Sequence, residues 1–209
     1  MLSYFKPIGL LVARLIIYSL VLVGIAQLLF LDAFNVIDGG KFSENSYTEW
    51  AQVGVLILII LVTFWTGKVS PKEKVIINSM LGFFLMALIR EFDFYLDNYV
   101  FDGAWQVLAF STLAVTIIYL VRNKEAIEQA SQNVFQTSAF GLISAGILIT
   151  FIFSRLYGRT SFWEAVMEQK YFRDVKNVSE EGIELLGYGI ILIGCIELFR
   201  ILLNARTAD

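Results

Sequence analysis

Apolar residues in this chain form six long runs that short polar segments separate, and several of these runs reach 18 residues or more. A run of this length is typical of a helix that crosses a lipid bilayer. The pattern therefore predicts an all-α fold, a polytopic membrane bundle of about six transmembrane helices. The expected spans are residues 8–31, 49–67, 71–97, 104–122, 134–157 and 180–203.

Polar residues that favour helix starts stand before several of these runs. Residues 46–49 and 70–73 both match a capping box, in which Ser and Glu side chains satisfy the free amides of a first turn. Ser179 is the expected cap of the last span. A third box at 161–164 opens a segment too short and too charged to cross a membrane. Its aromatic residues predict one short interfacial helix at about 162–173.

The composition supports a membrane protein built as one domain. The 209 residues are 57% hydrophobic and 17% charged, whereas soluble domains are about one quarter charged. Mean hydropathy is +0.70. Two prolines and the lack of a low-complexity tract leave little room for a disordered region. We therefore expect a single integral membrane domain over residues 1–209.

The loops between the expected spans predict the orientation. The end that holds both termini and the loops at 68–74 and 122–132 is rich in Lys and Arg, which mark the cytoplasmic side. The segment 155–178 argues against this orientation, because it carries five Lys or Arg at the opposite end. The pattern favours a multi-pass protein of the cell inner (plasma) membrane with both termini in the cytoplasm.

Acidic residues gather at the expected outer end. Fourteen of the 19 Asp and Glu residues lie there, together with seven Lys or Arg. Because this surplus of negative charge repels phosphates, it excludes nucleic acid as an outer partner, and it favours cations near the outer surface.

The residue types that are missing limit the chemistry. There is no histidine, which excludes imidazole-bound zinc, haem and di-iron sites and also a Ser-His-Asp triad. Cys195 stands alone within an apolar run, so neither an intramolecular disulfide nor a cysteine metal site is expected. An enzyme would have to use carboxylates, Arg, Lys, Tyr or Ser. The sequence favours a protein that is not an enzyme.

The strongest departure from the apolar pattern is the stretch LIREFDFYLDNY, at the outer end of the expected span 71–97. On one continuous helix, Arg90, Asp93 and Asp97 lie within about 60° of one another, and Glu91 lies about 100° away. The helix dipole disfavours acids at a C-terminus, and an ionised group at membrane depth costs about 2.5–3.5 kcal/mol. Other groups must therefore offset these acids.

A second group of acids begins the last expected span. Glu181, Glu184 and Tyr188 share one face of that helix. Gly187 and Gly194 form a neighbouring stripe that allows another helix to approach closely. The candidate polar cluster, drawn from three spans, comprises Glu49, Arg90, Glu91, Asp93, Glu181, Glu184 and Tyr188.

Two kinds of ligand suit this cluster. Several carboxylates around a partly desolvated point fit a divalent cation such as calcium, manganese or magnesium. The expected metal ligands are Glu91, Asp93, Glu181 and Glu184. The same cluster could instead hold a proton, because neighbouring carboxylates disfavour one another's ionised form. Either ligand fits a role in transport or sensing, with Arg90 orienting the acids.

A structural role is the main alternative. Arg90 then pairs with Glu181 or Glu184 and locks the helices together. In this case the segment 158–178 presents a surface to a second copy of the chain, as a homo-oligomer, or to another membrane protein.

Simpler interpretations also exist for single residues. Glu180 and Glu181 suit the N-terminus of a helix as solvated acids. Glu197 and Arg200 suit an i, i+3 ion pair at the inner edge of the membrane. A smaller alternative is a carboxylate-dependent membrane hydrolase, in which two carboxylates of an outward-facing cleft perform acid–base chemistry on a lipid or glycan.

Overall fold

The computed structural model describes residues 2–35, 42 and 46–208, and every regular element within these residues is helical. Five helices are long and apolar enough to cross a membrane, and a bent pair of helices makes a sixth candidate span. The prediction of an all-α bundle of membrane-spanning helices is therefore confirmed.

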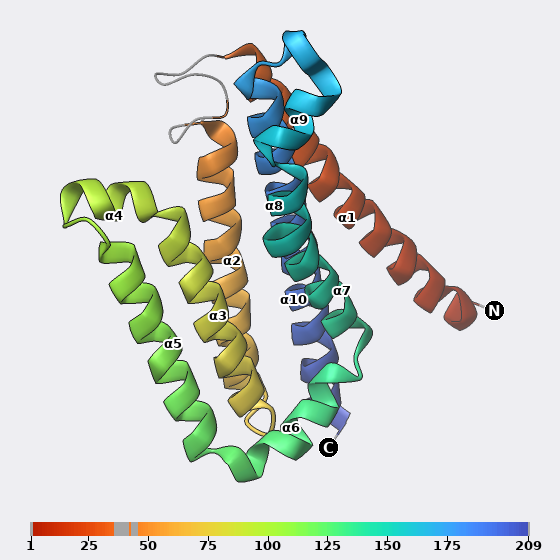
Figure 1. Ribbon diagram of the computed structural model, residues 1–209. Coiled ribbons are helices and arrows are strands. Elements are labelled where there is room, and N and C mark those ends of the chain that lie inside the picture. The colour runs from red at the N-terminus through yellow and green to blue at the C-terminus, as the bar shows by residue number, and fades with distance from the viewer. Residues whose placement is uncertain (1, 36–41, 43–45, 209) are drawn as a thin grey trace.

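Twelve helical elements follow one another along the described parts of the chain (Figure 1). The helices of the spans are α1 (Leu2–Phe34), α2 (Tyr47–Val69), α3 (Lys74–Glu91), α5 (Ala104–Arg122), α7 (Ser138–Leu148) and α10 (Arg173–Ala208). The shorter elements are α4 (Asp93–Tyr99), α6 (Lys124–Phe135), the π-helical segment η1 (Ile149–Phe153), α8 (Ser154–Tyr157), α9 (Thr160–Met167) and the 3₁₀ turn η2 (Glu168–Lys170). Together, α7, η1 and α8 form one span.

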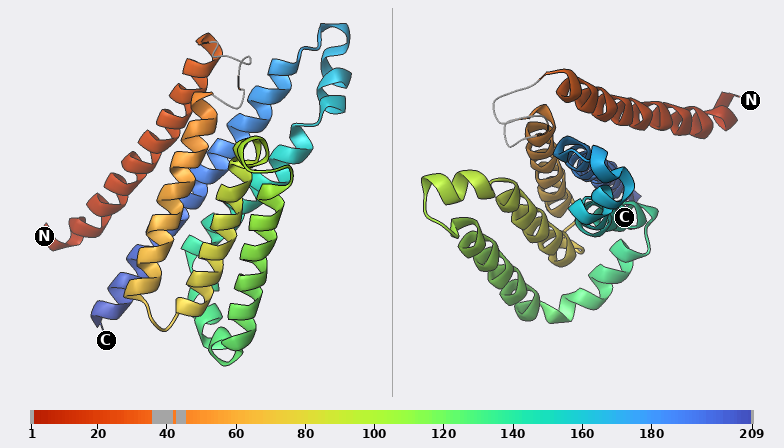
Figure 2. Two further views of the ribbon diagram at one scale, coloured as in Figure 1. Left: turned by 90° about the vertical axis from the view of Figure 1, so that its left-hand side faces the viewer. Right: turned by 45° about the horizontal axis from the view of Figure 1, so that its top comes forward.

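Helix α10 lies at the centre of the bundle. It packs against α7, η1 and α8 on one side and against α2 on another, while α1 diverges from the bundle toward its N-terminus (Figures 1 and 2). α3 packs against α2, and α5 packs against α3 at the far edge. We call the end with α4 and α9 the outer end, and the end with α6 and the loop between α2 and α3 the inner end, at the top and bottom of Figure 1.

Two glycines on α10 let the α7–η1 span approach closely. A Cβ atom on Gly187 would lie 2.0 Å from the Thr150 hydroxyl and 3.1 Å from the Gly146 carbonyl oxygen. A Cβ atom on Gly194 would lie 2.7 Å from the Ile143 side chain. The predicted close approach at both glycines is confirmed. It fixes the register between the two spans that carry most of the outer charges.

The third predicted span, 71–97, is not one straight helix. α3 ends at Glu91, and α4 begins at Asp93 at an angle of 61°. The break places Asp93 at the start of a new helix, where the dipole favours an acid. Its Oδ1 accepts a hydrogen bond from the Phe94 amide at 2.6 Å. A straight helix would have left this carboxylate near an unfavourable C-terminus.

The start of α10 also differs from the prediction. This helix begins at Arg173, well before the predicted start at 180. Ser179 lies inside it and is not its cap, since its hydroxyl donates to the Val175 carbonyl at 2.7 Å. Glu180 and Glu181 therefore lie beyond the first turn, where the helix dipole no longer stabilises an acid.

In one of the three predicted capping boxes, the serine caps a helix as expected. Ser46 caps α2, since its hydroxyl accepts a hydrogen bond from the Glu49 amide at 3.2 Å. The box at 70–73 does not cap a helix, because the Ser70 hydroxyl donates to the Glu73 carboxylate and α3 begins after both residues.

Two short helices differ from those that the pattern of polar residues predicts. α6 covers residues that the sequence assigns to a loop, and it buries Ala130 and Val134 against the bundle. The predicted interfacial helix is shorter than expected: α9 ends at Met167, and α10 already begins at Arg173. Ser161 does not cap α9, because this helix starts at Thr160.

Candidate functional site

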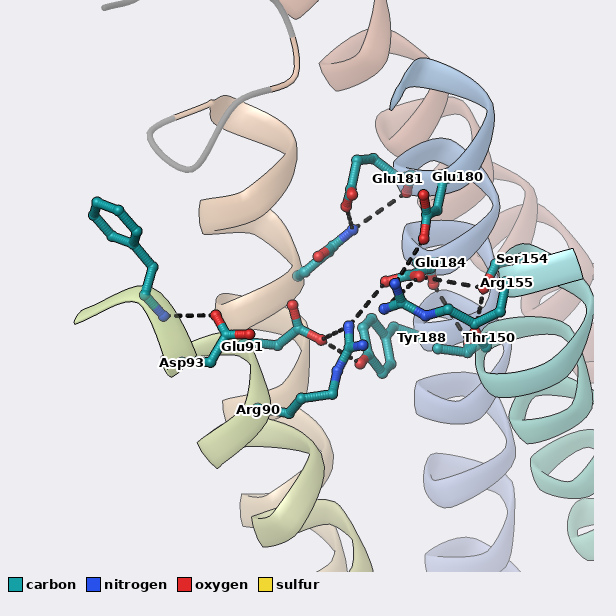
Figure 3. A network of polar contacts seen from close by, with 12 residues as sticks. Arg90, Glu91, Asp93, Thr150, Ser154, Arg155, Glu180, Glu181, Glu184 and Tyr188 are labelled. Carbon is teal, nitrogen blue, oxygen red and sulfur yellow. Dashed lines mark hydrogen bonds and ion pairs between the residues drawn. The ribbon is translucent and has the colours of Figure 1, made fainter. Parts of the chain in front are cut away.

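Charged and polar side chains from four elements meet in the outer half of the bundle (Figure 3). α3 contributes its last two residues, α8 its first two and α2 a single glutamine, while α10 contributes the rest. We call this set the outer network, and it comprises Gln52, Arg90, Glu91, Ser154, Arg155, Lys176, Glu180, Glu181, Glu184 and Tyr188.

Arg90 joins α3 to α10. Its Nη2 lies 3.2 Å from Glu91 Oε1 and 3.3 Å from Glu184 Oε2. The Tyr188 hydroxyl donates to Glu91 Oε1 at 2.7 Å. Because the Glu184 side chain is only 1% exposed, its charge depends on these partners and not on solvent. The predicted pairing of Arg90 with an acid of the last span is confirmed for Glu184.

Arg155 joins α8 to α10 and binds the Glu184 carboxylate, which Arg90 also binds. Its Nη2 lies 2.8 Å from Glu184 Oε1, and its Nη1 lies 2.6 Å from Glu180 Oε1. The Ser154 hydroxyl lies 3.2 Å from Glu184 Oε1. Lys176 pairs with the second oxygen of Glu180. Glu184 thus lies between two guanidinium groups, one from α3 and one from α8 (Figure 3).

The π-helical segment η1 leads directly into this site. Its Thr150 hydroxyl lies 3.5 Å from the Glu184 carbonyl oxygen and against Gly187, where only a hydrogen atom fits. π-Helical turns widen a helix by one residue and occur often at functional sites. Here the turn immediately precedes Ser154 and Arg155, the two residues of α8 that reach Glu184.

Glu181 is held by an amide and not by a cation. The Gln52 Nε2 group donates to Glu181 Oε2 at 2.9 Å and to the Glu181 carbonyl oxygen at 3.2 Å. Within the described part of the chain, no Lys or Arg pairs with this carboxylate. Two buried polar atoms also have no partner among these residues: Gln52 Oε1 and Arg90 Nε. The network therefore contains one carboxylate without a cation and one free acceptor beside it.

The structure brings together some of the predicted members but not all. Arg90, Glu91, Glu184 and Tyr188 form one connected group. Asp93 lies away from Arg90, because the bend after α3 turns it toward α4 (Figure 3).

Glu49 lies at the margin of this group. It is half-buried and lines a shallow cleft at the outer ends of α2 and α3, together with Trp50, Glu91 and Tyr95. This position suits the predicted role of a carboxylate at the mouth of the site.

The predicted four-carboxylate metal site is not assembled. Among the residues that the structure describes, no group of three or more His, Cys, Asp or Glu side chains could hold a metal ion. Two physical reasons account for the error in the proposed ligands Glu91, Asp93, Glu181 and Glu184. Arg90 binds Glu91 and Glu184, and the helix break removes Asp93.

The sequence pattern does not single out Arg155 or Lys176 as members of this site. Arg155 carried a usable signal, because it is a charged residue near the end of an apolar run, and such residues in membrane spans need a partner. Glu180 was assigned to solvent, but it is only 6% exposed and binds both Arg155 and Lys176. That interpretation is wrong because α10 extends past it into the outer segment.

A second, smaller cluster lies nearer the inner end. Glu197 on α10 accepts hydrogen bonds from Arg14 at 3.2 Å, from the Tyr18 hydroxyl, and from Arg200 Nε at 2.9 Å. The predicted pair of Glu197 with Arg200 is confirmed, and Arg14 adds a link from α1 to α10. We call these four residues the inner cluster.

The two polar groups differ in charge. The outer network contains four carboxylates, three cationic side chains and one phenol, so its formal charge is −1. One proton or one monovalent cation would neutralise it.

Comparisons of the chain with protein-family models, with curated proteins and with solved structures found no match.

Proposed function

We propose that this membrane-spanning protein takes up and releases a proton, or a monovalent cation, at the outer network, in a transport or sensing role. The supporting observation is the missing positive charge around Glu181. Groups with net charge are costly at membrane depth, so a buried cluster that lacks one positive charge attracts a small cation.

Gln52 favours a proton over a larger ion. Its Nε2 already donates to Glu181, and its Oε1 is buried without a partner among the described residues. A protonated Glu181 carries an O–H group, and an amide oxygen accepts such a donor readily. A buried acceptor without a donor costs about 1–3 kcal/mol, and a Glu181 O–H group that donates to Gln52 Oε1 would remove this penalty.

The proposal includes an orientation. The excess of Lys and Arg at the inner end favours an orientation in which this end and both termini face the cytoplasm, in the cell inner membrane. The outer network then faces the exterior leaflet, and Glu49 lies at its mouth beside Glu91. A proton would enter from outside and reach Glu181.

The experiment is a spectroscopic search for the protonated carboxyl. Infrared difference spectra of the purified protein should show its C=O band in a pH range where exposed carboxyls remain ionised. We expect the band in the natural protein and in the control Glu164→Gln, which removes an acid of α9, but not in Glu181→Gln. If the band is absent from the natural protein, or persists in Glu181→Gln, then this assignment of the proton is wrong.

Transport is tested separately in proteoliposomes that contain a pH-sensitive dye. A membrane potential should drive proton entry in the natural protein and in Glu164→Gln, and Glu181→Gln should stop it. A protonation band without flux assigns the protein to sensing, and flux without the band indicates that another group carries the proton.

A structural role is the second candidate, because Glu184 ties together α3, α8 and α10 through two guanidinium groups. The segment 158–178 would then bind a partner membrane protein or a second copy of the chain at the outer end. This candidate requires that variants with the charges neutralised in pairs fold and still bind the partner. We do not put forward hydrolysis, since Glu91 and Glu184 are both bound to Arg90 and are not free to act as an acid and a base.

A further inference from the structure

An apolar groove runs along the inner half of the bundle, between α2, α3 and α5, away from the outer network. Its volume is about 620 Å³. Its apolar lining includes Leu81 and Leu85 of α3 and Leu108 and Val115 of α5. Gly82 allows α5 to close one side, because its Cα lies directly against the Thr116 side chain.

The inner mouth of the groove is positively charged. Lys68 lies in the last turn of α2, and Lys74 in the first turn of α3. The Lys68 ammonium lies 5.1 Å from the centre of the Phe64 ring, which itself lines the groove. Within the described residues, neither lysine forms an ion pair. Two cations thus face the groove with their charges unmatched.

A polar pair lies just inside this mouth. The Asn78 amide donates to the Tyr119 hydroxyl at 3.1 Å, and the tyrosine keeps its own proton for another acceptor. Beyond this pair, two threonine hydroxyls are satisfied on their own helix: Thr112 donates to the Leu108 carbonyl and Thr116 to the Thr112 carbonyl, both at 2.8 Å. The groove therefore has a polar, cationic mouth and an apolar interior.

The dimensions match one leaflet of a bilayer. Between Lys74 and Leu85 the groove follows α3 for eleven residues, or about 16 Å. The hydrocarbon layer of one leaflet is about 15 Å deep. An acyl chain in the groove would thus place its headgroup at the level of the two lysines.

We propose that this groove binds an anionic phospholipid, with one acyl chain against Leu85 and Leu108 and the phosphate between Lys68 and Lys74. The Tyr119 hydroxyl donates to an ester or phosphate oxygen of the same lipid. Basic pockets between membrane helices on the side with excess Lys and Arg recognise such headgroups through charge. A zwitterionic lipid fits the apolar part equally well but leaves the two lysines without a net counter-charge.

Native mass spectrometry of the purified protein, with phosphatidylglycerol and phosphatidylcholine in competition, tests this site. We expect one tightly bound phosphatidylglycerol. The double variant Lys68→Gln/Lys74→Gln should bind it about 30-fold more weakly, given about 1 kcal/mol for each lysine. The matched control Arg122→Gln/Lys124→Gln removes two cations of the same end outside the groove and should leave binding unchanged.

A second pair of variants tests the apolar part. Leu85→Trp fills the groove and should displace the lipid, whereas Leu58→Trp, on an exposed part of α2 outside the groove, should not. Equal binding of the two lipids, or equal loss in the test and control variants, overturns the proposal. Competition by glycerol phosphate without acyl chains overturns it as well, since the headgroup alone would then account for binding.

Discussion

The outer network and the inner cluster contain the same types of side chain with opposite balances. In the inner cluster one carboxylate, Glu197, receives two guanidinium groups and a phenol, so positive charge is in excess. In the outer network four carboxylates share three cations, so negative charge is in excess.

This difference separates two roles for buried charge. Glu197 has three donors, two of which are guanidinium groups, so its negative charge is fully matched. The inner cluster can therefore hold α1 to α10 without needing any further ligand. The outer network is deeply buried at Glu184 and incomplete at Glu181, which is the arrangement expected where a charge is gained and lost.

The largest expected effect is that of Arg90→Met. This change leaves Glu91 and Glu184 with less positive charge in a buried site, and breaking such a pair typically costs about 3–5 kcal/mol. The free energy of unfolding in mixed micelles, measured against increasing denaturing detergent, should fall by that amount. Arg159→Met, at an exposed arginine without an ion pair in the described structure, should change it by less than about 0.5 kcal/mol.

The same variant has an internal check. Adding Glu91→Gln and Glu184→Gln to Arg90→Met removes the unpaired charges and should recover most of the loss. If Arg90→Met is as stable as the natural protein, Arg90 is hydrated independently and the outer network does not hold the helices together.

The second effect concerns packing beneath the outer network. Gly187→Ala places a methyl group 2.0 Å from the Thr150 hydroxyl, and overpacking of this kind costs about 1–3 kcal/mol. The melting temperature in detergent should fall, and Ser154 and Arg155 should move from Glu184. Gly54→Ala is the matched control, because its Cβ meets nothing within 4 Å, and it should be neutral or slightly stabilising.

The result also separates packing from charge. If Gly187→Ala lowers stability but leaves proton uptake at Glu181 intact, the close contact serves only to hold α10 against η1. If both are lost together, the π-helical turn positions the charges of the outer network.

The sequence predicts those features that depend on position within a single helix. Apolar run lengths indicate the spans, and helical periodicity places Gly187 and Gly194 on one stripe of the last helix and Glu184 on one face with Tyr188. The sequence does not predict features that depend on how the chain bends and on which helices pack together. The bend after Glu91 removed Asp93 from the cluster, and no periodicity shows that Arg155 of a different span approaches Glu184.

The smallest effect is expected for the inner cluster. Glu197→Gln removes the charge that binds Arg14 and Arg200, but both arginines are long enough to reach the membrane surface and hydrate there. The Glu197 side chain is only 11% exposed, but its partners Arg14 and Arg200 are 31% and 44% exposed. Because such partners can be hydrated when the pair is broken, the free energy of unfolding should fall by about 1 kcal/mol. The same detergent titration used for Arg90→Met measures it. A loss as large as that of Arg90→Met would mean that the stability of the inner cluster depends equally on its charge balance. The contrast between the two regions would then not distinguish a site that exchanges charge from a site that only joins helices.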